Sequence, residues 1–266
     1  MDEYTEKNRE LWNELTPIHA RSDFYDVEAF KAGGINLKSI ELEEVGDVSG
    51  KSLLHLQCHF GMDTLSWARL GAKVTGIDNS DKSIETARSL SEELGIEAKF
   101  ILTNVYDLPD VLDGEFDIVF TSYGVLCWLP DLRRWAEIIA HYLKPGGFFY
   151  IVEWHSILNI FDDSQDATEL RVALSYFHTP EPVRWEPERD YADKDAIRTH
   201  PSYEWTHSMG DILNALIDAG LRIEFLHEFP MLAWRQYPFM EQDKEGWFRI
   251  KGDKVPLLFS MKAVKE

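Results

Sequence analysis

KSLLHLQCHFGMDTLSWARLGAKVTGIDNS, residues 51–80, is the stretch that decides the fold of this chain. The apolar run from Ser52 to Leu56 has the length of a buried strand, and the segment from Met62 to Leu70 has apolar residues at helical spacing. A second apolar run, Ala72 to Ile77, ends directly before Asp78. The order of strand, tight turn, helix, strand and acidic residue is typical of one half of a nucleotide-cofactor site.

The turn at residues 57–61 and the carboxylate of Asp78 are expected at the same edge of the sheet. In an open α/β sheet, ligands bind outside the carboxyl ends of the strands, so both features face one cleft. A carboxylate in that place can accept hydrogen bonds from both hydroxyls of a ribose.

These residues resemble the first motif of the class I S-adenosylmethionine-dependent methyltransferases, in which an acidic residue precedes three alternating glycines. In this chain Gly61 is the third glycine, and Gln57 and His59 replace the other two. His55 stands in the place of the acidic residue. The glycines normally let the backbone approach the aminoacyl end of the cofactor. In their absence, Gln57 and His59 either supply side-chain contacts or pack into the interior.

A variant subgroup of the same family carries HLQCHFG, followed by DTL and by a strand that ends in VTGID, as this chain does. The resemblance to that subgroup covers most of residues 8–155 and again residues 203–230. It implies S-adenosyl-L-methionine as the cofactor.

Two further strands bring residues to the same edge. Lys99 to Leu102 precedes Asn104, which stands where the family commonly has an acidic residue beside the adenine amino group. The side-chain carbonyl of Asn104 can accept from that amine, although Asn is also a common turn residue. Phe116 to Thr121 is a strand that ends before Ser122 and Tyr123, which the resemblance places beside the transferable methyl group.

The remaining elements complete the sheet. A helix from Asp131 to Leu143, closed by the turn LKPGG, precedes a fifth strand from Phe148 to Val152. A capped helix from Asp211 to Ala219 then leads to two strands, Arg222 to His227 and Pro256 to Val264. We predict an α/β fold: a Rossmann-like doubly wound sheet of seven strands with the last strand antiparallel, a helical N-terminal cap and an insertion after the fifth strand. A dehydrogenase would more often continue with another parallel unit.

We expect residues 1–266 to form a single methyltransferase domain. Within it, residues 1–50 are an N-terminal helical cap and residues 51–155 the cofactor-binding core. Residues 156–204, rich in charge, Pro and aromatic side chains, are too long for a simple connector and are expected to be a substrate lid. Residues 205–266 supply the final helix and strand pair. A lid over the cleft would exclude water and select the acceptor.

The residues expected to hold the cofactor share the turn after the first strand or the ends of the next three strands. They are Gln57, Cys58, His59, Gly61, Asp78, Asn79, Asn104, Val105 and Ser122.

Acceptor and catalytic residues are expected around the same edge. Candidates for an aromatic or polar acceptor pocket are Trp12, His19, Tyr25, Tyr123, Trp154 and His207, with Trp128 and Trp205 as further rings. An OH or NH acceptor needs a base. His155, supported by Glu153, is the first candidate for that base; the alternative is a polar cluster that caps backbone groups at the strand end.

No metal site is expected. His55, Cys58 and His59 are residue types that bind zinc, but no second ligand pair stands at a recognisable spacing.

Composition limits the partners. The net charge of −20 disfavours nucleic acid, which needs clustered Lys and Arg, and also anionic membrane surfaces. No apolar run approaches 18 residues, the first residues do not read as a secretion signal, and the two cysteines do not suggest disulfides. We therefore expect a cytoplasmic protein with no membrane partner. The sequence does not specify an oligomeric state.

The leading interpretation is an S-adenosylmethionine-dependent methyltransferase that acts on an oxygen or nitrogen of a small-molecule acceptor. One alternative is a catalytically inactive protein of the same fold that binds the cofactor or a nucleoside. Another is an NAD-dependent oxidoreductase.

Overall fold

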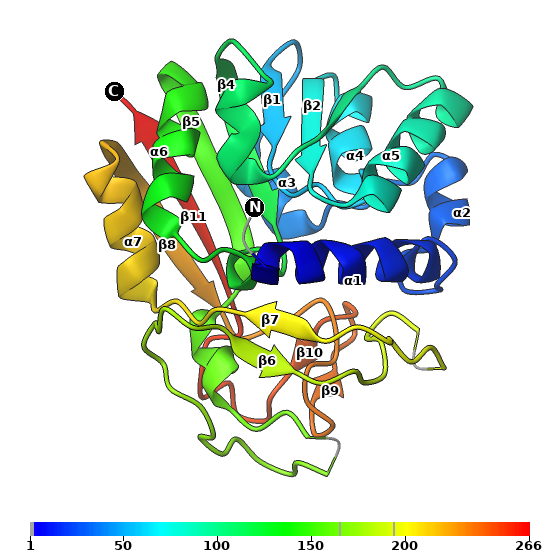
Figure 1. Cartoon of the computed structure of the whole chain (residues 1–266), viewed down its shortest axis with the longest axis vertical. Helices are drawn as coiled ribbons and strands as arrows, with labels where there is room; N and C mark the ends of the chain where they lie inside the picture. The colour runs from blue at the N-terminus through cyan, green and yellow to red at the C-terminus, as the bar shows by residue number, and fades with distance from the viewer. Residues whose placement is uncertain (1–2, 165, 194) are drawn as a thin grey trace.

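A computed structural model describes residues 3–164, 166–193 and 195–266. A seven-stranded sheet in the order β3-β2-β1-β4-β5-β11-β8 forms its centre (Figure 1). The strands are β1 (Ser52–His55), β2 (Lys73–Asp78), β3 (Lys99–Leu102), β4 (Phe116–Ser122), β5 (Leu143–Trp154), β8 (Leu221–Phe229) and β11 (Leu258–Lys265). The last strand, β11, lies between β5 and β8 and is antiparallel to both. This confirms the predicted sheet and its antiparallel last strand.

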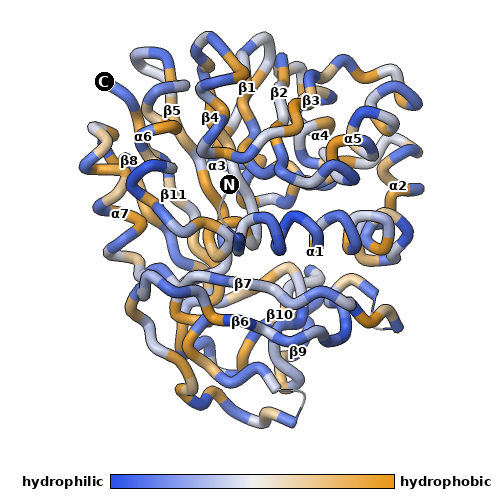
Figure 2. Tube along the Cα trace, viewed as in Figure 1, coloured by the Kyte–Doolittle hydropathy of each residue, from blue (hydrophilic) through white to orange (hydrophobic). Residues whose placement is uncertain are grey.

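Helices cover both faces of the sheet. They are α3 (Ser39–Val45), α4 (Met62–Arg69), α5 (Asp81–Leu94), α6 (Leu132–Tyr142) and α7 (Met209–Asp218). Side chains alternate along each strand, so Leu54 packs in one core with α6 and α7, whereas Leu53 packs in another with Trp67 of α4. Burial on both faces explains why the strands read as continuous apolar runs. Figure 2 shows hydrophobic residues, in orange, along the central strands of the sheet.

The LKPGG segment departs from the prediction. It was expected to be a turn between a helix and a strand that starts at Phe148, but β5 already begins at Leu143. Phe116 pairs with Leu143 and Ile118 with Phe148, so the residues between them bulge out of the ladder. Gly146 takes the φ of 77° that the bulge requires.

A second layer lies beyond the carboxyl ends of β1, β2 and β4. Helix α1 (Glu3–His19) crosses there, followed by α2 (Val27–Lys31). Below α1 in Figure 1 are two small hairpins, β6 (Val183–Trp185) with β7 (Ser202–Glu204) and β9 (Glu241–Gln242) with β10 (Phe248–Arg249). Short 3-10 helices η1 (Val105–Asp110), η2 (Leu126–Trp128) and η3 (Ser156–Ile160) complete the chain. Among the residues described, no helix is long and apolar enough to cross a membrane.

Candidate active site

A cavity of about 1420 Å³ lies at the carboxyl edge of the sheet. Its walls come from the strand ends, from α1, from the 156–204 insertion and from the connection between β8 and β11. Small-molecule sites commonly have volumes of roughly 300 to 1,000 Å³. The cavity therefore has room for a nucleotide cofactor and an acceptor together.

Every residue expected to hold the cofactor lines this cavity. The set is Gln57, Cys58, His59, Gly61, Asp78, Asn79, Asn104, Val105 and Ser122. The structure thus brings them to one place, as the order of strands predicts.

Asp78 is fixed at the end of β2 by two backbone groups. Its Oδ2 accepts the N–H of His59 at 2.8 Å and its Oδ1 accepts the N–H of Ser80 at 2.8 Å. Burial raises the pKa of Asp78 to about 6, while these N–H groups lower it. At neutral pH the carboxylate is ionised and joins the 57–61 turn to the start of α5.

Two residues of the 57–61 turn that replace glycines of the family motif keep a left-handed backbone conformation. Gln57 has a φ of 55° and His59 a φ of 51°, values that side chains other than glycine rarely adopt. The N–H of Cys58 donates to the Ile77 carbonyl at 2.8 Å. The N–H of His59 donates to the carboxylate of Asp78, and this hydrogen bond holds the next peptide in place. Left-handed residues of this kind cost about 1 to 3 kcal/mol each and gather at functional sites.

Three buried polar atoms of this turn face no partner among the described residues: His55 Nε2, Gln57 Oε1 and His59 Nε2. His55 Nδ1 lies 2.8 Å from Thr64 Oγ1, and burial lowers the pKa of His55 to about 4, so the ring is neutral. Gln57 Nε2 donates to the Val125 carbonyl at 3.0 Å. Unpaired buried polar atoms are costly, and the residues that carry these three atoms belong to the cavity wall.

Asn104 caps the 3-10 helix η1. Its Oδ1 accepts the N–H of Tyr106 at 2.9 Å, which is the turn-forming role weighed above. A carbonyl oxygen has two lone pairs, so one remains for an exocyclic amine in the cavity.

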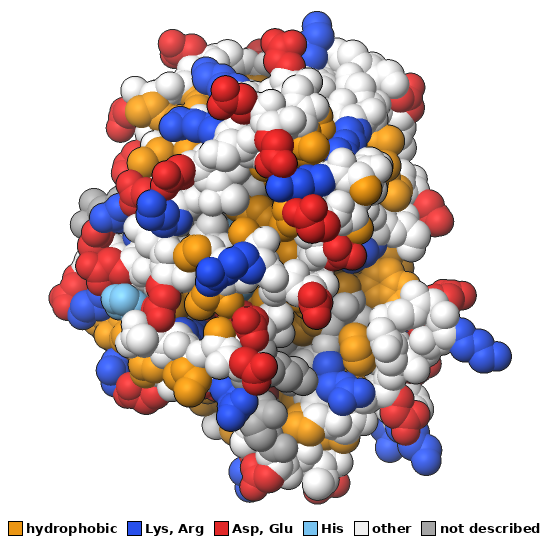
Figure 3. All heavy atoms as spheres, turned by 90° about the vertical axis from the view of Figure 1, so that its right-hand side faces the viewer, with side chains coloured by type: hydrophobic (Ala, Val, Ile, Leu, Met, Phe, Trp, Pro, Cys, Tyr) orange, Lys and Arg blue, Asp and Glu red, His pale blue; other side chains and the backbone are white. Residues whose placement is uncertain are grey.

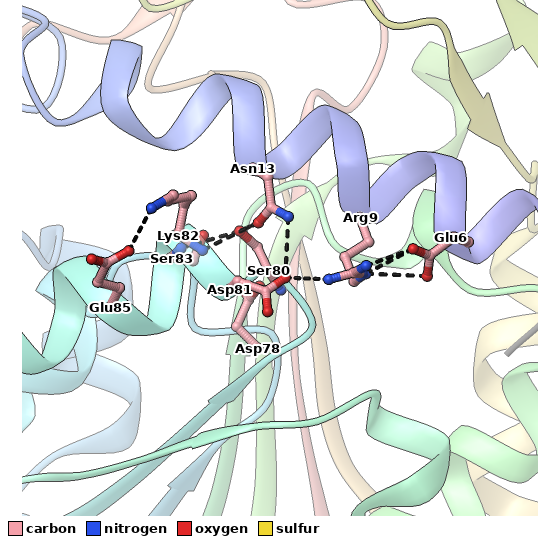
Figure 4. A network of polar contacts seen from close by, with 9 residues as sticks. All are labelled: Glu6, Arg9, Asn13, Asp78, Ser80, Asp81, Lys82, Ser83 and Glu85. Carbon is pink, nitrogen blue, oxygen red and sulfur yellow. Dashed lines mark hydrogen bonds and ion pairs between the residues drawn. The ribbon is translucent and has the colours of Figure 1, made fainter.

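Helix α1 is held over the site by polar contacts with the start of α5 (Figure 4). Asn13 Oδ1 accepts from Ser80 Oγ at 2.7 Å and from the N–H of Lys82 at 3.1 Å. Asn13 Nδ2 donates to Asp81 Oδ2 at 3.1 Å, and Arg9 pairs with the same carboxylate. Because Ser80 also donates its N–H to Asp78, this network links α1 to the carboxylate of Asp78.

The expected acceptor residues divide into two groups. Trp12, Tyr25, Tyr123 and Trp154 line the cavity. His19 lies behind this wall: its ring packs 5.1 Å from the ring of His59, and its Nε2 lies 3.0 Å from Asp190 Oδ2.

His207 lies away from the large cavity. Its Nε2 lies 2.7 Å from the Leu129 carbonyl, its ring stacks on His178, and burial lowers its pKa to about 4. These contacts fit a structural role better than an acceptor contact.

His155 caps the 3-10 helix η3 at the end of β5. Its Nδ1 accepts the N–H of Ile157 at 3.1 Å, so its proton is on Nε2, which lies 2.8 Å from Glu228 Oε1. Burial lowers the pKa of His155, and the side chain is not part of the cavity wall. Both nitrogens are therefore engaged at the strand end.

Glu153 organises the backbone after β4. Its Oε2 accepts the N–H of Val125 at 2.7 Å and its Oε1 the N–H of Trp154 at 2.7 Å. Burial raises the pKa of Glu153 and these donors lower it. Glu153 and His155 thus make the backbone contacts of the alternative, a polar cluster at the strand end, and their catalytic role stays a prediction.

Sequence reasoning missed three residues of the site. Asp63 in the first turn of α4 lines the cavity and accepts from Ser122 Oγ at 3.0 Å. Trp234 lines the acceptor side, and Glu41 lies behind Tyr123. Asp63 could have been found from its place two residues after Gly61. Within the described residues, no group of His, Cys, Asp or Glu is arranged to hold a metal ion.

Residues 54–151 match the family model described as a methyltransferase domain. The chain is therefore similar to that family over 98 of its 266 residues. A ubiquinone biosynthesis O-methyltransferase of Bordetella pertussis is 31% identical over 138 residues, 52% of each chain. One of Xanthomonas euvesicatoria is 29% identical over 202 residues, 75% of each chain. The chain thus spans about half the length of the Bordetella relative.

Solved structures share the fold of this chain at low identity. An S-adenosylmethionine-dependent methyltransferase from Mesorhizobium loti is 21% identical with a TM-score of 0.57, over 85% of this chain and 98% of that one. The magnesium protoporphyrin IX methyltransferase from Synechocystis with bound S-adenosylmethionine is 15% identical with a TM-score of 0.56, over 100% and 99%. At such identities the likeness shows the fold alone.

Proposed function

We propose that this protein transfers the methyl group of S-adenosylmethionine to an oxygen of a small-molecule acceptor. The observation that carries the proposal is the meeting of Asp78 with the residues of the 55–59 segment at the wall of one large cavity. The names of the relatives, O-methyltransferases, support oxygen as the acceptor atom.

The side chains present fit the two ends of this cofactor. Asp78 is placed to accept from the ribose hydroxyls, and Asn104 from the adenine amine. Gln57 Oε1 is an acceptor for the ammonium of the aminoacyl end, and a neutral His55 or His59 ring can donate to its carboxylate. These side chains replace the backbone contacts of the usual glycines, which is how we interpret the variant HLQCHFG turn.

The bound cofactor supplies a methyl group on a positively charged sulfur. The chain contributes position and shelter: strand ends hold both reactants, and the cap and the insertion close over them. Holding the acceptor oxygen in line with the methyl group supplies much of the acceleration in such a displacement. We propose residues 1–50 and 156–204 as the cap and lid of one domain.

Calorimetry with S-adenosylhomocysteine tests the cofactor assignment. We expect binding of this nucleoside and no competition by NAD. Asp78→Ala should weaken binding by about 1 to 3 kcal/mol, because ribose hydroxyls lose their partner. Asp107→Ala, an exposed carboxylate outside the cavity, is the matched control. Tighter binding of NAD than of S-adenosylhomocysteine would overturn the assignment.

Product formation tests the activity itself. Incubation with methyl-labelled S-adenosylmethionine and a library of small hydroxyl compounds should yield a labelled methyl ether. Binding of the cofactor without any labelled product would favour the alternative of a binding protein that does not catalyse transfer.

A further inference from the structure

Tyr123 and Glu41 form a buried hydrogen-bonded pair at the wall of the cavity. Tyr123 follows β4 and lines the cavity, while Glu41 in α3 is fully buried and does not reach it. The Tyr123 hydroxyl donates to Glu41 Oε2 at 3.0 Å. The other oxygen of Glu41 accepts the N–H of Lys38 at 2.8 Å. Tyr123 is thus the link between a hidden carboxylate and the space where an acceptor would lie.

The backbone of Tyr123 is held in an uncommon conformation that points to a function. Its φ is 35°, and its N–H donates to the Val152 carbonyl of β5 at 2.8 Å. Left-handed residues with large side chains persist only where the surroundings enforce them, and they gather at functional sites. β4 lies next to β1 in the sheet, so Tyr123 and the 57–61 turn are at neighbouring strand ends.

Two tryptophan rings lie near the ring of Tyr123 at the cavity wall. The ring of Trp234 lies edge-on to the ring of Tyr123, with 6.0 Å between the ring centroids. The ring centroids of Trp154 and Trp234 are also 6.0 Å apart. All three line the cavity. Flat apolar walls of this kind favour an aromatic ring, through stacking and edge-to-face contacts, over an aliphatic chain.

We propose that the acceptor is an aromatic hydroxyl compound bound against Tyr123, Trp154 and Trp234, and that Tyr123 relays its proton to Glu41. This inference rests on the proposed methyl transfer and names its substrate class and proton path.

The relay balances charge and protons. The acceptor hydroxyl donates to Tyr123 Oη while its oxygen forms the new bond to the methyl carbon. The carbon–sulfur bond breaks, and its electron pair stays on sulfur, which becomes neutral. The acceptor proton passes to Tyr123 as the proton of Tyr123 passes to Glu41. The products are a methyl ether, a thioether and a protonated Glu41, which returns its proton through Tyr123 to water in the cavity after the products leave.

The environment of Glu41 suits a proton acceptor near neutral pH. The pKa of Glu41 is raised to about 7, mainly by burial and also by the nearby carboxylate of Asp63. The N–H of Lys38 and the hydroxyl of Tyr123 lower it, and the phenol of Tyr150 also faces this carboxylate. The pKa of Tyr123 is raised well above its usual value, mainly by burial, so Tyr123 passes a proton on and does not keep its own charge.

The same helix supplies a matched control. Tyr150 of β5 donates to Glu44 Oε2 at 2.7 Å, and Glu44 is one turn after Glu41 in α3. Neither Tyr150 nor Glu44 lines the cavity. Tyr150→Phe and Glu44→Gln therefore alter a neighbouring tyrosine–carboxylate pair and leave the hydrogen bond between Tyr123 and Glu41 in place.

The binding test uses calorimetry on the full chain saturated with S-adenosylhomocysteine. Catechol should bind at least about tenfold more tightly than cyclohexane-1,2-diol, which has the same hydroxyls on an aliphatic ring. Trp234→Ala should remove this preference. Equal affinities for the two diols would overturn the aromatic acceptor. Failure to bind S-adenosylhomocysteine at all would instead reject the proposed function.

The kinetic test uses transfer of labelled methyl from S-adenosylmethionine to catechol, 3,4-dihydroxybenzoate and 4-nitrocatechol. Tyr123→Phe and Glu41→Gln should each lower kcat by on the order of 100-fold, with affinity for S-adenosylhomocysteine within about twofold of the wild type. The wild-type kcat should fall about tenfold per pH unit below pH 7, and Glu41→Gln should lose this dependence. The control variants should keep both rate and pH profile.

Three results would overturn the relay. They are no labelled product from any of the three phenols by a protein that binds S-adenosylhomocysteine, an unchanged rate in Tyr123→Phe, or an acid limb that persists in Glu41→Gln. A loss of rate in the control pair equal to that in the relay variants would assign the effect to stability of the fold.

Discussion

Gln57 combines a strained backbone with a buried amide oxygen that has no protein partner. If that oxygen accepts from the ammonium of the cofactor, Gln57→Leu should weaken S-adenosylhomocysteine binding by about 1 to 2 kcal/mol, roughly tenfold. 5′-Methylthioadenosine lacks the ammonium and carboxylate, so its affinity should not change. Calorimetry with both ligands measures the difference. Equal losses for the two would mean that the substitution distorts the turn as a whole.

His155 should matter for stability. Its two hydrogen bonds join η3 and β8 at the end of β5. His155→Ala should lower the free energy of unfolding by about 1 to 3 kcal/mol, because a buried N–H and a carboxylate lose their partners. Urea unfolding measures this, with the exposed His141→Ala as control. A normal stability together with a large loss of kcat would restore His155 as a candidate base.

Single residues of the site were predictable to different degrees. The position of Asp78 could be predicted from the sequence, because the apolar pattern shows where β2 ends and at which edge of the sheet its last residue lies. Glu41 was not, because Glu41, Glu43 and Glu44 are equivalent in sequence and only the docking of α3 decides which one is buried. The left-handed backbone of Gln57 was also hidden, since local preference opposes it and tertiary hydrogen bonds impose it.

Helix α1 owes its position to Asn13, whose side chain contacts three residues at the start of α5. Asn13→Ala should loosen this helix over the cavity and raise the dissociation rate of S-adenosylhomocysteine about threefold to tenfold, the effect of losing roughly 1 kcal/mol of hydrogen bonding. Stopped-flow displacement measures the rate. Glu10→Ala on the exposed face of α1 is the control. An unchanged rate would show that α1 does not limit release.

Helices and strands have the bounds predicted from the sequence where the local residue pattern and the burial of the element agree. β3 has the predicted bounds, and Ser208 and Asp211 form the expected capping box of α7. The hairpin of β6 and β7 was not predictable, because its short strands are far apart in the chain and pair only through tertiary contacts. The LKPGG bulge was missed because Pro and Gly indicate a turn equally well inside a strand or before one.

Charged side chains of both signs lie side by side on the face of the molecule drawn in Figure 3. Lys and Arg side chains are scattered among Asp and Glu on the face in Figure 3. With a net charge of −20, repulsion between carboxylates grows as they ionise and opposes the folded state. Buried carboxyl groups with raised pKa values add to this dependence on pH.

Glu41 lets this contribution be isolated. Its pKa is about 7 in the folded protein and 4.5 in its ordinary state. Between about pH 4.5 and 7 the folded state holds a proton that the unfolded chain has released, so stability falls as pH rises through this window. The shift corresponds to about 3 kcal/mol. Urea unfolding of the ligand-free protein should show lower stability at pH 8 than at pH 5.

Glu41→Gln should reduce that difference by up to about 3 kcal/mol, because Gln carries no titrating proton. Asp78, whose pKa burial raises to about 6, should leave part of the dependence in place. Glu43→Gln on the exposed side of α3 should behave as the wild type, since it keeps the buried carboxyl. An identical pH dependence in the wild type and in Glu41→Gln would show that Glu41 does not hold a proton near neutral pH, and the acid limb expected for kcat would then need another group.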